Sequence, residues 1–383
     1  MSSVLILGAA GSIGSAVASA YVNHGLTVYG LVRSQEKADL VAKNEIIPLI
    51  ASIADVDVWG PVAEKVDIVV EAVGNYTDRV TSDLIFNKLK VIASQKPELI
   101  ILYTSGCLVY ADSQDLINEN SPYNLTNAYF PIRKSYEELY KSIGAIVIQP
   151  AFLYGKQGSA SSYYFKNATQ PVDGQVTLFG KKDQYRSFVH SYDLGQLYLL
   201  AGLKGQAVKG NIFLGSSNYF KSEEVIYAIA KEAGVEVKQV NFIAPPDDDF
   251  YAFIYSISNR LSSKKAETLL GWKPTRVSLL DHTKQYLQAW NYKKTLIIIH
   301  YYYFYIDVLF KKHIFDRGSY KSKEKPTIGT KVAVYIEYPP PSKRITIINS
   351  NHIHTTIFQL NFHCSILSAK INICKDTSTE KHS

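Results

Sequence analysis

The first 155 residues alternate between short apolar runs and stretches with helical spacing. Residues 4–7 (VLIL) form an apolar run, a glycine-rich turn follows, and residues 12–25 (SIGSAVASAYVNHG) have the apolar spacing of a helix. A second β-rich run, TVYGLVR, covers 27–33. This order of strand, glycine turn, helix and strand predicts a βαβ unit of about 30 residues.

Further apolar runs continue the pattern at 67–74, 99–106 and 145–155, and residues 77–95 between them have helical spacing. Strands that read as continuous apolar runs and alternate with helices indicate a parallel sheet with helices on both faces. The predicted fold class is therefore α/β, with a Rossmann-type doubly wound parallel sheet.

Changes in residue composition divide the chain into three parts. Residues 1–155 are expected to form a nucleotide-binding domain, and the Gly-, Ser- and Tyr-rich residues 156–292 a smaller substrate lobe interleaved with the last sheet elements. Residues 295–383 hold 15 Ile but only two Ala and two Gly. We therefore expect 293–383 to be a disordered appendage or a spurious translated extension; a genuine extension is the alternative.

One helix of the lobe is predicted in detail. Residues 222–234 (SEEVIYAIAKEAG) combine an amphipathic pattern with Ser222 as N-cap, glutamates in the first turn and Gly234 at the end. A second helical run, 262–272, ends at Gly271.

The formal charge of +7 does not predict a nucleic-acid partner. Residues 293–383 hold 14 basic and 6 acidic side chains, which leaves 27 basic and 28 acidic ones in 1–292. The body is nearly neutral and lacks a basic footprint.

Cysteine usage and hydropathy favour a cytoplasmic protein without a membrane partner. The three cysteines are scattered: Cys107, Cys364 and Cys374. Such spacing does not build a disulfide framework and suggests a reducing compartment. The longest apolar run, 295–310, is shorter than the roughly 20 residues that a spanning helix needs. No metal site is expected either, because the histidines of the body are isolated and only the appendage has a pair, in 352–354.

The segment 8–14 (GAAGSIG) has the spacing of a dinucleotide-binding loop. Gly8 stands where the strand turns sharply, Gly11 where the backbone must approach a pyrophosphate, and Gly14 where the helix packs closely on the strand. The amides at the helix start, at Ser12, Ile13 and Gly14, are expected to face the anion.

The end of the second strand bears on the choice between NAD and NADP. An acidic residue there would bind the ribose 2′-hydroxyl, but this chain has Arg33 and Ser34. A guanidinium suits a phosphate, so NADP(H) is favoured, with NAD(H) as the alternative.

With these residues in view, about 1–290 resembles the extended short-chain dehydrogenase/reductase superfamily, also called the NAD-dependent epimerase/dehydratase family, and more closely its atypical NAD(P)-dependent oxidoreductases. The marks of the resemblance are GAAGSIG (8–14), DIVVEAVG (67–74), YTSGCLVY (103–110), QPAFLYG (149–155), SFVHSYDLG (187–195) and LLGWKP (269–274).

The resemblance implies roles for several positions. The nicotinamide ribose would pass Ala72, Val73 and Gly74, and the carboxamide would lie against Pro150, Ala151 and Phe152. Ser105, with Thr104 behind it, is the candidate to bind the substrate oxygen, although the family's hydroxyl often stands where this chain has Gly106. His190 and Asp193 belong to the lobe boundary, and we expect His190 to be structural.

The family's proton donor is a tyrosine followed four residues later by a lysine. Here Tyr129 is followed at that offset by Arg133, with Lys134 one place late. A nearby cation lowers the pKa of a tyrosine from about 10. Pro131 favours the first turn of a helix, which would place Tyr129 just outside it. Tyr129, Ser105 and Arg133 are the catalytic candidates.

These observations favour an NAD(P)-dependent oxidoreductase that acts on an aldehyde, ketone or alcohol group of a small molecule. A nucleotide-sugar epimerase or dehydratase is one alternative, and Arg33 argues against it. A non-catalytic NAD(P)-binding redox sensor, similar to the NmrA-like regulators, is another. A homodimer is possible, as is common in the family.

Overall fold

The computed structural model describes most of the body of the chain and three strands of the remainder. The described ranges are 2–74, 78–124, 129–155, 160–291, 332–336, 344–349 and 358–359, with the backbone alone at 129–130 and in the last three. The chain forms two compact units, Met1–Tyr303 and Phe304–Ser383. In the second unit, β15 (Val332–Ile336), β16 (Arg344–Asn349) and β17 (Phe358–Gln359) form an antiparallel sheet. The rest of the expected appendage, with Cys364, Cys374 and 352–354, lies outside the described residues.

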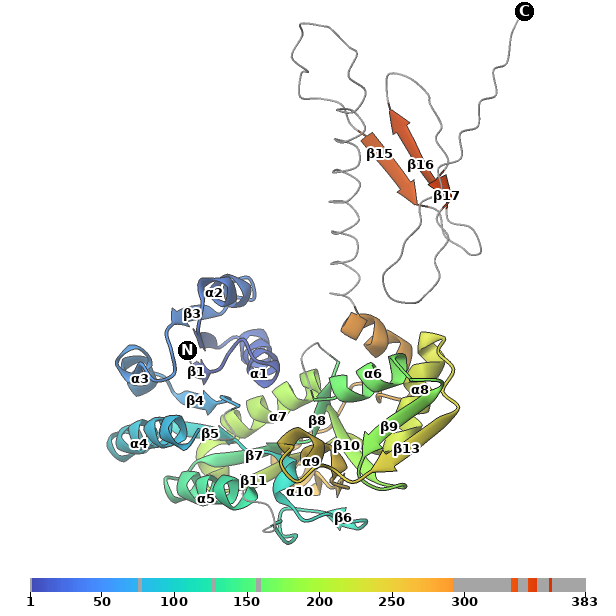
Figure 1. Ribbon diagram of the computed structural model, residues 1–383. Coiled ribbons are helices and arrows are strands. Elements are labelled where there is room, and N and C mark those ends of the chain that lie inside the picture. Colours follow the sequence, from blue (N-terminus) through green and yellow to red (C-terminus); the bar gives the residue numbers. More distant parts are fainter. Residues whose placement is uncertain are drawn as a thin grey trace, which may run out of the picture. The chain divides into compact units, whose positions relative to one another are not determined.

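The first unit contains a seven-stranded sheet in the order β3-β2-β1-β4-β5-β7-β11, with every pair parallel (Figure 1). Its strands are β1 (Ser3–Leu7), β2 (Thr27–Val32), β3 (Ile47–Ile50), β4 (Ile68–Glu71), β5 (Ile100–Thr104), β7 (Ile146–Pro150) and β11 (Ile212–Gly215). The predicted Rossmann-type fold class is confirmed. The strand order reverses between β1 and β4, and ligands of such sheets bind outside the carboxyl ends at this point.

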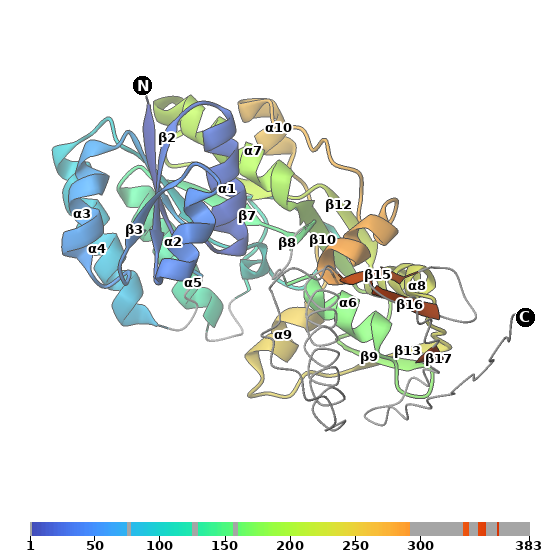
Figure 2. The same cartoon turned by 90° about the horizontal axis from the view of Figure 1, so that it is seen from above.

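Helices cover both faces of the sheet. One face is packed by α1 (Ser12–Asn23), α2 (Gln35–Ala42) and α7 (Ser191–Lys204). The other is packed by α3 (Val56–Lys65), α4 (Arg79–Gln95) and α5 (Tyr129–Ser142). Figure 2, which looks from above, shows α1 beside α7, and α3 beside α4. Two apolar cores result, one on each face of the sheet.

The remaining elements form a smaller lobe with a third apolar core. Its strands are β8 (Phe152–Tyr154), β10 (Tyr185–His190) and β12 (Asn218–Lys221) in one sheet, β9 (Gln175–Phe179) with β13 (Gln239–Ile243), and β6 (Leu116–Ile117) with β14 (Arg260–Leu261). Its helices are α6 (Ser162–Thr169), α8 (Ser222–Ala233), α9 (Phe250–Ser256) and a helix over 283–291. The helix α10 (Lys264–Leu270) instead packs against α7 and β11 and shares the apolar core on that face of the main sheet. Because β11 and α7 return to the main sheet, the two parts are interleaved; the boundaries at 155 and 292 remain predictions.

Two local expectations differ from the structure. The apolar run 145–155 forms two strands in different sheets: β7 pairs with β5 and β11, and its ladder ends where the Ala151 amide donates to the Gly215 carbonyl at 2.9 Å, whereas β8 pairs with β10. Ser222 is the first residue of α8 and not its N-cap, which is Lys221. Ser222 is fully buried, and its hydroxyl lies 3.2 Å from the Tyr164 hydroxyl.

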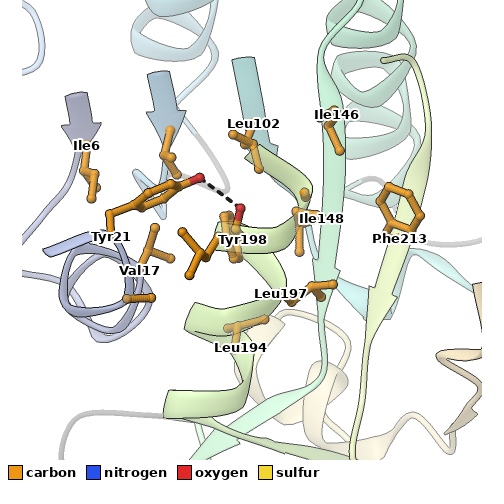
Figure 3. Packing of buried hydrophobic residues seen from close by; sticks show 14 of the residues in the cluster. Ile6, Val17, Tyr21, Leu102, Ile146, Ile148, Leu194, Leu197, Tyr198 and Phe213 are labelled. Carbon is orange, nitrogen blue, oxygen red and sulfur yellow. Dashed lines mark hydrogen bonds between the residues drawn. The ribbon is translucent and has the colours of Figure 1, made fainter. Parts of the chain in front are cut away.

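The contact between α1 and α7 depends on small residues. A Cβ on Gly195 of α7 would lie 2.5 Å from the Ala16 carbonyl oxygen of α1, so only glycine permits this approach. At the same interface the buried Tyr21 hydroxyl donates to the Tyr198 carbonyl at 2.9 Å (Figure 3). Tyr198 in turn donates to the Thr104 hydroxyl at 2.8 Å, which joins α7 to the end of β5.

Among the described residues, no helix has both the length and the apolarity to cross a bilayer.

We predict that Tyr21→Phe lowers the free energy of unfolding by about 1 kcal/mol, because it removes one buried hydrogen bond while keeping the packing. Chemical denaturation measures the change. Tyr227→Phe, at a side chain that is 42% exposed, is the matched control and is expected to change stability by less than about 0.5 kcal/mol. Equal effects of the two variants would contradict the role of the α1–α7 bond.

Candidate functional site

The glycines of the loop 8–14 are required by close backbone contacts. Gly8 has φ +90°, and a Cβ there would lie 2.7 Å from the Ala72 carbonyl oxygen. A Cβ on Gly14 would lie 2.2 Å from the Gly8 carbonyl oxygen. The Gly11 amide donates to that same oxygen at 3.0 Å. The loop therefore holds the end of β1, the start of α1 and the end of β4 against one another, and side chains at Gly8 or Gly14 would force them apart.

The start of α1 has the features of an anion site. Gly11 is its N-cap, no side chain caps it, and no acidic residue lies in its first turn. By contrast, Ser34 caps α2 and Asp78 caps α4. The first amides of a helix carry partial positive charge. Ser12 and Ile13, the first two residues of α1, present these amides beside the point where the strand order reverses.

The end of β2 places one cation at the surface. Val32, the last residue of the strand, is buried, and Arg33 directly after it is exposed. The Ser34 hydroxyl accepts from the Lys37 amide at 3.3 Å, so it serves the start of α2. Both residues are exposed, and Arg33 differs from Ser34 in taking no part in the cap of α2.

The segments predicted for the nicotinamide end lie at neighbouring strand ends. Ala72, Val73 and Gly74 follow β4, and Pro150 ends β7. Ala151 and Phe152 are both buried, and the Phe152 ring lies under the guanidinium of Arg186 at 4.4 Å. Their predicted contacts with a cofactor remain proposals.

The helix that carries the catalytic candidates begins one residue earlier than expected. Pro131 lies in the first turn of α5, as predicted, but Tyr129 is the first residue of α5 and not the residue outside it. Proline fits any position of the first turn, because those amides have no partner within the helix. Positions 129 and 133 are therefore one turn apart in the same helix. The Tyr129 side chain lies outside the described residues.

Arg133 is directed to the end of β5. Its Nη1 donates to the Tyr103 hydroxyl at 3.1 Å and to the Thr104 carbonyl at 3.5 Å. Lys134, the next residue, lies with its ammonium 4.6 Å from the centre of the Tyr123 ring.

Ser105 is buried and donates its hydroxyl to the Glu137 carboxylate. The Gln149 side-chain amide and the Tyr123 hydroxyl donate to the same carboxylate, at 2.8 and 2.9 Å. The structure thus places Ser105 in a buried network, whereas a Cβ built on Gly106 would meet open space. Burial raises the pKa of Glu137, and its three hydrogen bonds and the charge of Arg133 oppose that rise. Ser105 as the substrate-binding hydroxyl remains a proposal.

A second buried acid, Glu71, ends β4. It is 4% exposed and accepts a hydrogen bond from the Val73 amide at 2.8 Å. Burial raises its pKa to about 7, opposed by the Val73 hydrogen bond and the charge of Arg133.

In the lobe, Arg186 of β10 is a fully buried cation. Its Nε donates to the Tyr164 hydroxyl at 3.3 Å and its Nη2 to the Tyr255 carbonyl at 2.9 Å. Within the described residues its Nη1 has no hydrogen-bond partner, and no ion pair there includes it.

His190 and Asp193 have structural contacts. The His190 Nδ1 accepts from the Tyr192 amide at 3.0 Å and caps α7, which is the structural role expected. The Asp193 carboxylate accepts from the Thr275 and Arg276 amides at 3.0 and 3.1 Å. In the described part of the chain no three His, Cys, Asp or Glu side chains cluster as metal ligands would.

Sequence reasoning missed Glu71, Glu137 and Arg186. Glu71 stands inside an apolar run, and this exception was the available signal for a buried acid. Glu137 follows Arg133 by one helical turn, so its proximity could have been inferred from spacing. The burial of Arg186 depends on contacts with α6 and α9, which are distant in sequence.

Comparisons with known proteins agree with this geometry. The sequence profile of the NAD dependent epimerase/dehydratase family matches residues 4–214. The uncharacterized protein YLL056C of Saccharomyces cerevisiae is 27% identical over 303 residues, which cover 73% of this chain and 96% of the yeast protein. A UDP-glucose 4-epimerase of Halalkalibacterium halodurans is 26% identical over 220 residues, 51% of this chain and 63% of the epimerase.

Solved structures share the fold. The UDP-glucuronic acid 4-epimerase of Bacillus cereus in complex with NAD superposes with a TM-score of 0.61 at 17% identity, over 75% of this chain and 98% of the epimerase. A UDP-glucose 4-epimerase of Thermotoga maritima with UDP-glucose gives 0.60 at 17% identity, over 77% and 99%.

We predict that Glu137→Ala lowers the free energy of unfolding by about 2–4 kcal/mol, because it leaves two buried donors and one partly buried donor without an acceptor and opens a cavity. Glu138→Ala, at the adjacent exposed carboxylate that pairs with Lys141 at 3.3 Å, is the control and is expected to cost less than about 0.5 kcal/mol. Denaturant unfolding of both variants checks the difference. A loss at Glu137 no larger than that at Glu138 would refute the network.

Proposed function

Because the chain belongs to the NAD dependent epimerase/dehydratase family, we propose that it binds a nicotinamide dinucleotide and acts on a hydroxyl- or carbonyl-bearing small molecule, with a nucleotide sugar as the favoured substrate class. The observation that carries the proposal is the uncapped start of α1, enclosed by the contacts of Gly8 and Gly14 at the reversal of the sheet. Side chains at Gly8 and Gly14 would collide with neighbouring backbone, and the backbone amides at the start of α1 suit a diphosphate.

The residues present fit such a cofactor. The loop 8–14 would hold the diphosphate, and the segments 72–74 and 150–152 would border the nicotinamide. A nicotinamide ring supplies a carbon that accepts and returns a hydride. Tyr129 would move the proton of the substrate hydroxyl, and Arg133, one turn later, would favour the ionised form of that tyrosine.

A buried guanidinium supports a phosphate-bearing substrate. Arg186 has a free donor, Nη1, among the described residues, and no carboxylate pairs with it there. An unpaired buried charge is costly, and a diphosphate would compensate it with charge-assisted hydrogen bonds. Because Arg186 is fully buried and held by the Tyr255 carbonyl, such an anion requires movement of α9. The relatives named as UDP-sugar epimerases favour the same substrate class.

A second candidate function is net oxidation or reduction with NADP(H). The exposed Arg33 at the end of β2 favours it, because a guanidinium there can bind the 2′-phosphate that distinguishes NADP. Ser34 supports this less directly, since its hydroxyl already caps α2.

We predict that Gly11→Asp weakens the binding of NADH and NADPH at least about tenfold relative to Gly11→Asn. The two side chains have the same size, so the difference isolates the repulsion between a carboxylate and the diphosphate at the start of α1. Gly11 is exposed, and both variants are expected to fold. Fluorescence titration measures the affinities, and circular dichroism checks the fold. Equal affinities of the two variants would refute the proposed diphosphate position.

We predict that the full chain interconverts a UDP-hexose without net consumption of cofactor, and that Tyr129→Phe lowers the rate about 10²–10⁴-fold with cofactor affinity unchanged. Product analysis by chromatography and NADPH absorbance are followed together. Net NADPH consumption with a carbonyl substrate would instead favour the second candidate. Tight cofactor binding with neither activity would contradict both and favour a redox sensor.

A further inference from the structure

Glu71 is a buried acid at the carboxyl ends of the parallel strands, where the proposed cofactor binds. It ends β4, and the three residues before it in that strand are buried and apolar. A carboxyl group in such a place is stable only with hydrogen bonds or opposite charge. The groups that contact the Glu71 carboxyl therefore indicate its role.

Those contacts join β4, β5 and α5. The Glu71 carboxyl accepts from the Val73 amide at 2.8 Å, which fixes the turn that follows the strand. In the register of the sheet Glu71 is the partner of Tyr103 on β5. The Tyr103 hydroxyl accepts from Nη1 of Arg133, and the Tyr103 ring stacks on Tyr140 of α5 at 4.0 Å.

Glu71 is also the member of this group that can change charge near neutral pH. Burial raises its pKa to about 7, and Arg133 is the cation that acts against burial. The tyrosines that face it stay neutral, because burial raises the pKa of Tyr103 to about 12 and raises that of Tyr140 as well. Glu137, farther along α5, is held in its own network.

We propose that Glu71 is a positioning residue for the nicotinamide end of the site: its carboxyl group fixes the turn 72–74 through the Val73 amide and keeps the Arg133 guanidinium at the ends of β4 and β5. The inference rests on the proposed function in one respect: it assumes that the nicotinamide binds at the carboxyl ends of β4 and β5. An arginine suits position 133 because the acid at position 71 lies within its electrostatic reach. The ionised acid binds the Val73 amide and attracts Arg133 more strongly than the protonated acid does.

The two consequences of ionisation have opposite signs. The folded-state pKa of about 7 lies above the unfolded value of about 4.3. The stability that this group contributes is therefore fully present below the unfolded value and is lost as pH rises through about 7. Cofactor affinity should increase over the same interval, because the turn and Arg133 become better ordered.

The first test uses the full chain without cofactor. Melting temperatures of the wild type and of Glu71→Gln are compared from pH 5 to 8; glutamine keeps an acceptor for the Val73 amide and cannot ionise. The wild type is expected to lose more stability across this interval than the variant. Arg133→Met should move the midpoint of the wild-type loss to higher pH, because the cation that opposes burial is gone. Glu138→Gln, at an exposed carboxylate of α5, should follow the wild type.

The second test measures NADH and NADPH affinity by fluorescence at pH 6 and pH 8. The wild type should bind about 3–10-fold more tightly at pH 8, a ratio that corresponds to strengthening one hydrogen bond. Glu71→Gln should change less than about twofold. Glu71→Asp keeps an ionisable carboxyl group but shortens the side chain. If this variant retains the pH dependence, the effect comes from the charge and not from side-chain packing.

Equal pH profiles of the wild type and Glu71→Gln in both measurements would overturn the inference. An unchanged midpoint in Arg133→Met would overturn its coupling to Arg133. Failure to bind either cofactor at any pH would instead contradict the proposed function, and the melting profiles would still decide whether Glu71 and Arg133 act together.

Discussion

The position of the site depends on one backbone contact. Because a Cβ on Gly14 would lie 2.2 Å from the Gly8 carbonyl oxygen, α1 lies directly on the end of β1. This brings the uncapped start of the helix to the reversal of strand order, where its amides meet the carboxyl ends of β1 and β4. On the same face of the sheet α1 is also packed closely against α7, where a Cβ on Gly195 would lie 2.5 Å from the Ala16 carbonyl oxygen. The electrostatics of the proposed anion site therefore follow from packing of small residues, not from charged side chains.

On the opposite face of the sheet, α5 is fixed by buried polar contacts and not by the packing of small residues. There α5 is joined to β5 and β7 by buried polar groups: Glu137 with Ser105 and Gln149, and Arg133 with Tyr103. Buried polar groups add little net stability when satisfied but are costly when one partner is lost. They therefore specify one position and rotation of α5 more strongly than apolar contacts would. That precision matters for a helix whose first turn carries Tyr129.

The sequence predicted those parts of the fold whose signals are local. The glycine spacing of 8–14 and the apolar runs after it gave the βαβ unit and the parallel sheet, and Pro131 marked the start of α5. Strand alternation could have predicted more: Tyr103 faces α5 and Thr104 faces α7, so Ser105 returns to the α5 side. The register of the strand end was unknown, and the role of Ser105 was assigned from resemblance alone. The burial of Arg186 could not be predicted, because its neighbours come from β8, α6 and α9.

An arginine at position 133 can be understood either as the loss of a catalytic lysine or as one part of an altered set. The contacts favour the second interpretation. One Nη atom serves both the Tyr103 hydroxyl and the Thr104 carbonyl, and two buried acids, Glu71 and Glu137, lie within its electrostatic reach. A permanently charged fork suits this setting, since an ammonium is more strongly hydrated and loses its proton more readily on burial. A side chain that had merely lost its function would not need a buried acid to balance it, because the burial of that acid is itself costly. The chemistry proposed for Tyr129 is therefore best tested with Arg133 and Glu71 treated as one unit.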